Sequence, residues 1–469
     1  MTEQYGRLYV VAEFGIEPLT CGGACGESRM RLMRALMGLL GATLVGAAGF
    51  VALAWRPEIP AVEPPNKADF DPALITRGAE LTMLGNCNVC HTKADGRAYA
   101  GGRGLQTPFG TIYATNITPD PDTGIGRWSE TAFLRAMREG VRRDGSHLYP
   151  AFPYDHFTKV SGADLRAIYA FLMTREPVRA DTPANVLPFP LSMRTLIAGW
   201  KLMFLKVGEL GPDPVLSTEL NRGAYLVEGL AHCGACHTPR NSLGAERNEA
   251  YLGGGETQGW SAPALNASTT APVAWTADQL FAYLRNGFVP THGVAAGPMQ
   301  PVANNLGGVA EADVRAIAAY VAAIVGPPTA RRSERPGSPG APSDHQSSGL
   351  RAHGGSQTIA SADGAIIYAG ACAPCHEATG QRFSARGIHL ASSKAVAMPD
   401  ARNLAHVILE GIAPPQASPA AMMPGFADTL SDPQVVALMT YLRSSFSDRP
   451  IWDNVEDTVR RVRRSAEGS

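Results

Sequence analysis

The spacing of apolar and polar residues predicts a mostly helical protein with one membrane-length apolar segment. Residues 35–55, "ALMGLLGATLVGAAGFVALAW", are uncharged over 21 positions. As a helix, this segment would span roughly 30 Å, the thickness of a bilayer core. A cleavable signal peptide has a shorter apolar region of about 7–15 residues and a small-residue cleavage site. We therefore expect an uncleaved transmembrane anchor, with a cleaved signal as the alternative.

Basic residues before this segment predict its orientation. Arg29, Arg31 and Arg34 precede the apolar run, and the positive-inside rule places that end in the cytoplasm. Everything after Trp55 is then expected outside. Residues 1–34 are interpreted as a cytoplasmic N-terminal segment. The alternative is an extension that results from a misplaced start codon.

Amphipathic helices recur three times after the apolar segment. Apolar residues at i, i+3, i+4 and i+7 follow capping-type sequences, "SGAD" at 161–164 and "SDPQ" at 431–434. The expected buried positions are Leu165, Ile168, Tyr169 and Leu172; Val314, Ile317, Val321 and Ile324; and Val435, Leu438, Met439 and Leu442. Strand-like alternation is scarce. The pattern predicts a mostly α fold with three small domains in tandem.

The segments between these helices differ in composition. Residues 179–217 are Pro-rich but carry "LSMRTLIAGWKLMFLKV", which favours a structured connector that packs on the protein, a partner or the membrane. Residues 326–357 contain 17 Gly, Pro or Ser among 32 positions, which predicts a flexible linker. The expected domains are 68–178, 218–325 and 358–447, followed by a C-terminal tail at 448–469.

Composition and charge restrict the function classes. Hydrophobic residues make up 45% of the 469 residues, enough for packed cores. The net charge of −1 gives no electrostatic footprint for nucleic acid. We also find neither a nucleophile–base–orienter set nor a Gly-x-Gly-x-x-Gly after a strand, so we expect no catalytic site within this chain.

Six of the eight cysteines occur in a motif that appears three times. "GNCNVCHT" at 85–92, "AHCGACHT" at 231–238 and "GACAPCHE" at 370–377 each contain Cys-x-x-Cys-His. The pairs begin 146 and 139 residues apart, a repeat at domain scale. The motif residues are Cys87, Cys90 and His91; Cys233, Cys236 and His237; and Cys372, Cys375 and His376. Cys21 and Cys25 have no following histidine.

This motif is typical of c-type haem attachment. Two thiols three residues apart lie on one helical turn and match the two vinyl groups of a haem, and the next histidine is the proximal iron ligand. A zinc ribbon would need a second pair about 15–20 residues on, and a thioredoxin-like site a βαβ pattern. Disulfides would leave the histidines unexplained. The sequence therefore predicts three covalently bound haems.

Methionines before the last helix of a unit are candidate distal ligands. A thioether stabilises reduced iron and raises its potential. In "AAGPMQPV", Met299 lies in the expected loop before the helix at 311. In "AAMMPGFADTLSDPQ", Met423 directly precedes Pro424 and is preferred over Met422.

The first domain departs from this pattern, because Phe152 stands where a methionine is expected. His156 is the preferred sixth ligand, and His147 or an open iron are the alternatives. The corresponding loop reads "DGSHLYPAFPYDHFTKVSGAD".

Together these motifs resemble the three-haem cytochrome c subunits of membrane-bound bacterial dehydrogenases, over roughly residues 68–445. Beyond the haem motifs, "FGTIYATNITPDPDTGIGRWSETAFLRAMREGVRRDGSHLYPAFPY" at 109–154 and "NRGAYLVEGLAHCGACHTPRNSLGAE" at 221–246 carry the resemblance. The family includes partners of alcohol, gluconate and sorbitol dehydrogenases. "PAFPYDHFT" looks more like the branch associated with molybdenum hydroxylases such as nicotinate or isoquinoline dehydrogenases.

The resemblance implies an electron-transfer subunit anchored in the inner membrane, with its haem domains in the periplasm. A separate catalytic subunit (a molybdenum hydroxylase, quinoprotein or flavoprotein) would supply electrons, and ubiquinone or a terminal oxidase of the respiratory chain would accept them. One alternative is a haem enzyme, such as a peroxidase or reductase, with an open iron in the first domain. Another is a haem-based assembly or sensor protein.

Overall fold

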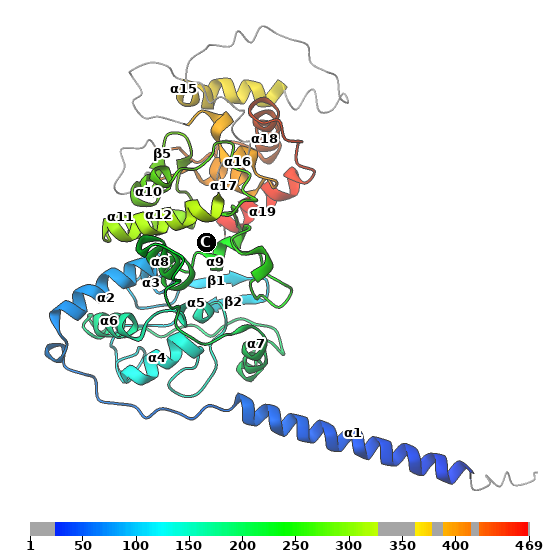
Figure 1. The fold of residues 1–469 in the computed structure, drawn as a ribbon. Helices are drawn as coiled ribbons and strands as arrows, with labels where there is room; N and C mark the ends of the chain where they lie inside the picture. The colour runs from blue at the N-terminus through cyan, green and yellow to red at the C-terminus, as the bar shows by residue number, and fades with distance from the viewer. Residues whose placement is uncertain (1–23, 327–361, 378–387, 414–421, 468–469) are drawn as a thin grey trace, which may run out of the picture. The chain divides into compact units, whose positions relative to one another are not determined.

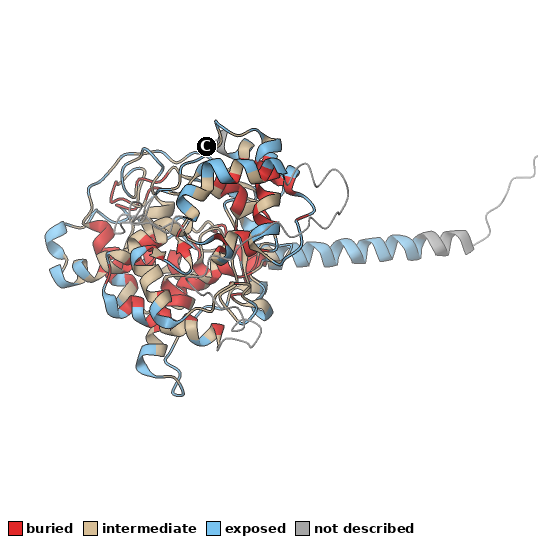
Figure 2. Cartoon of the chain, turned by 90° about the horizontal axis from the view of Figure 1, so that it is seen from above, coloured by how far each residue is buried: buried red, intermediate tan, exposed pale blue. Residues whose placement is uncertain are grey.

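The first unit of the chain contains one long apolar helix. The computed structural model describes residues 24–326, 362–377, 388–413 and 422–467 and divides the chain into two units, Met1–Trp55 and Arg56–Ser469 (Figure 1). In the first unit, α1 (Ala24–Ala54) has a segment, Met30–Ala54, that is long and apolar enough to cross a membrane. Most of α1 is exposed (Figure 2). A signal sequence near the N-terminus would have the same properties.

The second unit, Arg56–Ser469, is mostly helical, as the sequence predicts. Its first helices are η1 (Lys67–Asp69), α2 (Pro72–Leu84), α3 (Cys87–Cys90), α4 (Glu130–Glu139), α5 (Tyr154–Phe157) and α6 (Gly162–Met173). Next come η2 (Arg194–Leu196), α7 (Ile197–Phe204), α8 (Thr218–Ala224), η3 (Tyr225–Leu230), α9 (Gly234–His237), η4 (Asn248–Ala250), α10 (Ala277–Asn286), α11 (Met299–Gly307) and α12 (Glu311–Val325). The last are η5 (Tyr368–Cys372), α15 (Ala373–His376), η6 (Leu390–Ser392), α16 (Lys394–Ala397), α17 (Arg402–Glu410), α18 (Asp432–Phe446) and α19 (Val455–Glu467).

Short antiparallel hairpins provide the strands of the described residues. They pair β1 (Gly104–Thr107) with β2 (Gly110–Tyr113), β3 (Gly255–Thr257) with β4 (Trp260–Ala262), and β5 (Phe288–Val289) with β6 (Gly293–Val294). Cys21 and the expected linker, apart from Gly326, lie outside the described residues.

The three predicted amphipathic helices are confirmed as α6, α12 and α18. Every predicted core position on them is buried except Ile324, which is partly buried. Ser161 caps α6 by accepting the backbone N–H of Asp164 at 3.2 Å, and Ser431 begins α18 with a capping box to Gln434. Capping satisfies backbone donors that a helix start leaves unpaired, so these helices begin where the sequence predicts.

Each of these helices crosses an earlier helix at a glycine. A Cβ added to Gly78 would lie 1.9 Å from the carbonyl oxygen of Ala167, so only glycine allows this approach. The three glycine–carbonyl pairs are Gly78 with Ala167, Gly223 with Ala316, and Gly364 with Ala437. Four residues further along the second helix, the Cβ of an aromatic side chain packs on the same glycine: Phe171, Tyr320 and Tyr441. The same helix crossing is therefore built three times.

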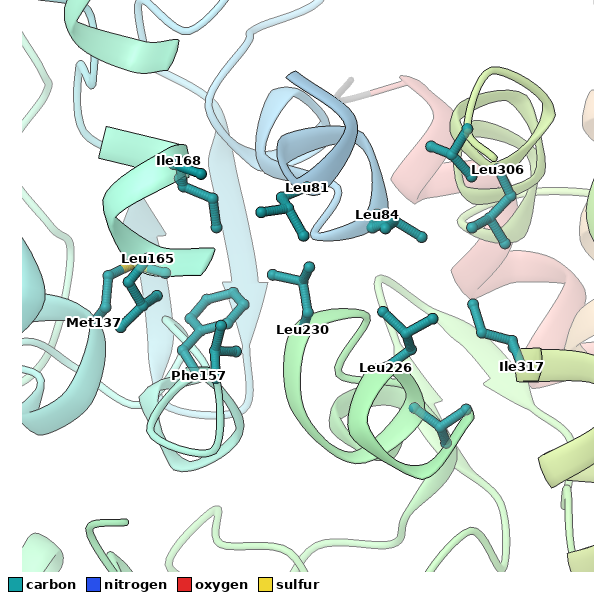
Figure 3. Close-up of a cluster of buried hydrophobic side chains, with 14 of the residues drawn as sticks. Leu81, Leu84, Met137, Phe157, Leu165, Ile168, Leu226, Leu230, Leu306 and Ile317 are labelled. Carbon is teal, nitrogen blue, oxygen red and sulfur yellow. The ribbon is translucent and has the colours of Figure 1, made fainter. Parts of the chain in front are cut away.

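The first and second crossings share one hydrophobic core. Leu81 and Leu84 of α2 lie close to Leu226 and Leu230 of η3 in this cluster (Figure 3). A second cluster of buried residues is formed by α16, α17, α18 and α19 with Tyr368. The third crossing thus has a core of its own, although the sequence predicts three separate domains of one kind.

The C-terminal residues pack as a helix. Residues 448–469 are expected to form a tail, but α19 buries Val455, Val459 and Val462 against α17 and α18. Arg463 also pairs with Asp432 at the start of α18, with Nε and Oδ1 2.6 Å apart. The apolar stripe is weak in the sequence of this segment, because most residues are charged and the valines recur only at i, i+4 and i+7.

Candidate haem sites

In all three Cys-x-x-Cys-His motifs, a backbone carbonyl fixes the histidine ring. The bonded pairs, each from Nδ1 to the carbonyl oxygen, are His91 with Thr115 at 2.6 Å, His237 with Pro263 at 2.7 Å, and His376 with Ile388 at 2.9 Å. A carbonyl can only accept, so Nδ1 carries the proton and Nε2 keeps its lone pair. This tautomer is the one that an iron ligand needs.

Two of the hairpins deliver these carbonyls. Thr115 lies just after β2, and Pro263 directly follows β4. Each histidine also accepts a hydrogen bond at its own carbonyl from a glycine N–H: Gly101 to His91 at 2.7 Å and Gly254 to His237 at 2.8 Å. Both glycines have positive φ, +75° and +96°, a region that disfavours other residues. The first two motifs are thus held in the same way.

The environment of the first two motifs keeps their histidines neutral. Burial lowers the pKa of His91, and it lowers the pKa of His237 to about 4. Both rings are therefore uncharged near pH 7, with a lone pair available for a metal. For His237, the nearby charge of Lys394 lowers the pKa further, after burial and against the bond to Pro263.

Burial keeps five of the six motif thiols protonated. Burial raises the pKa of Cys87 and of Cys233 to about 12, and it also raises the pKa of Cys90, Cys236 and Cys372. A thioether bond to haem carries no charge, so burial does not oppose it. One histidine directly after each cysteine pair matches the donor set for covalent haem.

A buried hydroxyl beside the second motif also fits a bound polar group. The hydroxyl of Tyr251 is buried without a hydrogen-bond partner among the described residues. A Cβ added to Gly234, between the two cysteines, would lie 2.9 Å from the Tyr251 ring. Burial raises the pKa of this tyrosine, so it stays a donor that a haem propionate could satisfy.

The two candidate methionines lie in different local structures. Met299 is expected in a loop, but it is the first residue of α11, directly after Pro298. Met423 forms an isolated antiparallel bridge with Ile412, with N to O distances of 2.9 and 3.0 Å. Both side chains are partly buried rather than core. Their role as distal ligands stays a prediction.

His156, the preferred sixth ligand, has other partners at both ring nitrogens in the structure, so its role at the iron stays a prediction. Its Nδ1 lies 2.7 Å from the carbonyl oxygen of Glu228, and its Nε2 lies 2.8 Å from Oε1 of Glu246. Both partners accept, so both nitrogens carry protons and neither has a free lone pair. The ring joins α5 to the second helix crossing. No local sequence pattern identifies these partners, which lie 72 and 90 residues from His156 in the chain.

Opposite charges strengthen the contact between His156 and Glu246. Burial opposes the charged imidazole, but the hydrogen bond and charge of Glu246 outweigh it and raise the pKa of His156. Burial likewise opposes the carboxylate, but the bond from His156 lowers the pKa of Glu246. Their side chains are only 4% and 9% exposed. The pair is a buried ion pair between the first two repeats.

The other residues predicted for the first site lie nearby. Phe152 packs on Phe157, with ring centroids 5.2 Å apart. His147 is buried, and its Nδ1 lies 3.0 Å from Nζ of Lys201. Burial lowers the pKa of Lys201 to about 7. His147 is thus joined to the connector helix α7.

Residues beside the first and second motifs contact helices that are distant in the sequence. Asn305 donates to Asn86 and Asn88, at 2.9 Å each, next to the first motif. After the second motif, the Trp260 ring stacks on His406 of α17 at 4.5 Å, with an interplanar angle of 15°. These bridging residues lie far apart in sequence and carry no motif that would have identified them.

Comparison with known proteins supports a haem protein. The protein-family model described as "Cytochrome C oxidase, cbb3-type, subunit III" matches residues 360–442. The chain is 45% identical to a nicotinate dehydrogenase subunit of Pseudomonas putida over 91% of its own length, but it spans only 35% of that protein. It is 36% identical to the cytochrome c subunit of alcohol dehydrogenase (quinone) of Gluconobacter oxydans, over 81% of this chain and 80% of the relative. It is also 36% identical to the gluconate 2-dehydrogenase cytochrome c subunit of Pantoea cypripedii, over 80% and 86%.

Proposed function

Because the chain belongs to the family of cytochrome c subunits of dehydrogenases, we propose that it carries electrons from a separate catalytic subunit to ubiquinone or another respiratory acceptor. Membership of this family implies covalently bound haem c. When bound, each haem supplies a one-electron iron couple. We propose three haems, one for each Cys-x-x-Cys-His motif, in three cytochrome c-type domains.

One observation carries the proposed haem number. The same arrangement, a histidine with Nδ1 bound to a backbone carbonyl directly after a cysteine pair, occurs at His91, His237 and His376. Each of these side chains would ligate iron through Nε2, and each cysteine pair would hold the haem edge. The glycine crossing repeated in each helix pair agrees with three domains of one kind.

The protein side chains would set the properties of each iron. Met299 and Met423 would supply soft thioether ligands that favour the reduced state. The carbonyl bonds would hold each histidine ring in one orientation and raise its basicity. A fixed ligand geometry keeps the two oxidation states alike, and this similarity makes electron transfer fast.

The partner and location follow from the same family membership. We propose that α1 anchors the protein in the bacterial inner membrane and that residues after Trp55 lie in the periplasm. The catalytic partner would be a molybdenum hydroxylase, a quinoprotein or a flavoprotein. The "PAFPYDHFT" sequence and the 45% identity to the nicotinate dehydrogenase subunit favour the molybdenum hydroxylase.

Substrate-driven reduction tests this proposal. The complex of this chain with its catalytic subunit is purified, and the substrate of that subunit is added without oxygen. Reduction of the haem absorption bands, followed by re-oxidation on adding a soluble ubiquinone analogue, is expected. Haem that stays oxidised while the catalytic subunit turns over with an artificial dye would contradict the electron-transfer role.

The second candidate is a haem enzyme with an open iron in the first domain. It is favoured by Phe152 at the expected methionine position and by the two hydrogen bonds that engage His156. An open iron binds carbon monoxide rapidly when reduced. Rapid binding by one of three haems, together with peroxide turnover, would favour this candidate. Slow binding by all of them would favour electron transfer alone.

A further inference from the structure

The connector between the first two helix crossings exposes an apolar surface that the proposed function does not use. Exposed apolar side chains cluster around η2 and α7, and Phe189, Leu202 and Met203 are 82%, 71% and 61% exposed. We define the connector face by these exposed residues: Phe189, Leu191, Met193, Leu196, Leu202 and Met203. A cluster of this kind on a protein marks an interaction site rather than ordinary surface.

Helix α7 is anchored by its opposite side. Ala198, Trp200 and Lys201 are buried, while Leu196, Leu202 and Met203 fall on the remaining arc at helical spacing. The Trp200 indole donates to the carbonyl of Leu243 at 3.0 Å, and the Tyr154 and Trp200 rings lie 6.0 Å apart. Leu202 and Met203 therefore belong to a fixed helix, not to a loose segment that could fold inward.

A single loop joins the connector to the residues that follow the membrane-length helix. The loop is formed by residues 140–147. Lys201 donates a hydrogen bond to the carbonyl of Gly140 at 2.6 Å, and Arg194 donates one to the carbonyl of His147 at 2.9 Å. The same loop contacts the start of the second unit, because a Cβ on Gly145 would lie 2.2 Å from the carbonyl oxygen of Arg56.

The segment after Arg56 is also fixed to the second unit. Ile59 donates to the carbonyl of Arg143 at 2.9 Å, and Arg135 donates to the carbonyl of Pro57 at 2.7 Å. Arg56 follows the end of α1, Ala54, by two residues, a distance of at most about 7 Å along the chain. The loop that contacts the connector therefore also contacts a residue only two positions beyond the apolar helix.

Charged side chains near this loop favour an anionic surface. Arg142 and Arg143 of the loop pair with Asp144 and Glu58, and Arg135 and Arg194 donate hydrogen bonds to carbonyls of the loop. Basic side chains beside apolar ones are typical of surfaces that rest on anionic lipid.

We propose that the connector face inserts into the head-group boundary of the membrane that α1 spans, so that the second unit rests on the lipid through this face. The proposal rests on the anchor role proposed for α1. Apolar side chains of η2 and α7 would enter the acyl boundary, and the arginines of the loop would meet lipid phosphates. The protein would then have one fixed orientation relative to the bilayer.

Photo-crosslinking to lipid tests this proposal on the full holo-protein. The protein is placed in nanodiscs of phosphatidylethanolamine and phosphatidylglycerol that contain a phospholipid with a diazirine on its acyl chain. After illumination, crosslinked peptides are located by mass spectrometry. Crosslinks are expected in α1 and in residues 189–203, at about tenfold the yield found around Ile366, an exposed apolar residue at the third crossing.

A double variant and its control make the test specific. Leu202→Glu with Met203→Glu should reduce crosslinking of residues 189–203 about fivefold and leave α1 and the haem content unchanged. Ile366→Glu, at a position 72% exposed, should change neither. Undiminished crosslinking in the double variant would overturn the proposal.

The remaining outcomes separate this proposal from the anchor itself. Crosslinks in α1 without crosslinks in residues 189–203 would overturn the lipid-facing connector and keep the anchor. A lack of crosslinks in α1 would overturn the anchor and this proposal with it. Protection of residues 189–203 from hydroxyl-radical labelling only after the catalytic subunit is added would assign the face to that protein instead, and would also overturn the proposal.

Discussion

Replacing His156 with leucine should destabilise the second unit and leave the haem ligands unchanged. The ring bridges Glu228 and Glu246 with two bonds, at 2.7 and 2.8 Å, and the two side chains of the ion pair are 4% and 9% exposed. Removing one partner of a buried pair leaves the other charge without compensation and costs about 3–5 kcal/mol. We expect a loss of that size in the free energy of unfolding.

Urea unfolding of four proteins measures the effect. The set is the wild type, His156→Leu, Glu246→Leu and the double variant, each followed by far-ultraviolet circular dichroism. The double variant should recover much of the loss, because an apolar pair can replace a buried ion pair at little cost. Lys206→Leu is the control, since this side chain is exposed and its loss should change stability by less than about 0.5 kcal/mol.

Spectroscopy of the same variants decides whether His156 ligates iron. The absorption and near-infrared magnetic circular dichroism bands of His156→Leu should match those of the wild type. Conversion of one haem to a high-spin, carbon-monoxide-binding form, with unfolding unchanged, would refute the reasoning. It would show that the ring leaves its two acceptors when haem is attached.

Three further predictions concern the ligands, the helix crossing and pH. Met299→Leu should remove about half of the near-infrared methionine–iron band and lower one haem potential, whereas Met203→Leu, on exposed surface, should change neither; redox titration checks both. Gly223→Ala would place a Cβ 2.2 Å from a carbonyl of the facing helix and should cost about 1–3 kcal/mol, while Gly370→Ala, with nothing within 4 Å, should be tolerated in the same urea assay. Glu246→Gln should cost most stability between the ordinary pKa values of 4.5 and 6.5 for this pair. Because the folded-state pKa of Glu246 is lowered, its contribution to stability is lost as pH falls through that pKa. Because the folded-state pKa of His156 is raised, its contribution to stability is lost as pH rises through that pKa. A cost independent of pH from 3 to 9 would contradict this assignment.

The sequence predicted the helices whose signals are local. The starts of α6 and α18 follow from their capping residues, and the predicted core positions follow from helical spacing. The three candidate haem histidines are predicted for the same reason, because the motif is contiguous, and their role stays a prediction. The carbonyls that orient them could not be predicted, since Thr115 and Pro263 follow hairpins whose strands are only three or four residues long and whose pairing has little sequence signal.

Long-range contacts account for the features that the sequence did not predict. His156 lies in a plausible position for a ligand, but its partners come from another repeat, and no local pattern reports that Glu246 lies beside it. The α19 helix was missed because its mean polarity is high and only Val455, Val459 and Val462 form its apolar stripe. In both cases packing between distant segments decides the role of a residue.

The intact mass of the holo-protein shows how many haems are covalently attached to the chain. The chain is matured in a host that attaches c-type haem, extracted with acidic acetone and weighed under denaturing conditions. We expect the mass of the polypeptide plus three haems. Cys233→Ser with Cys236→Ser should lose one of them, and Cys21→Ser with Cys25→Ser should lose none. Two haems or fewer on the wild-type chain, or no loss from the Cys233 and Cys236 variant, would contradict this expectation.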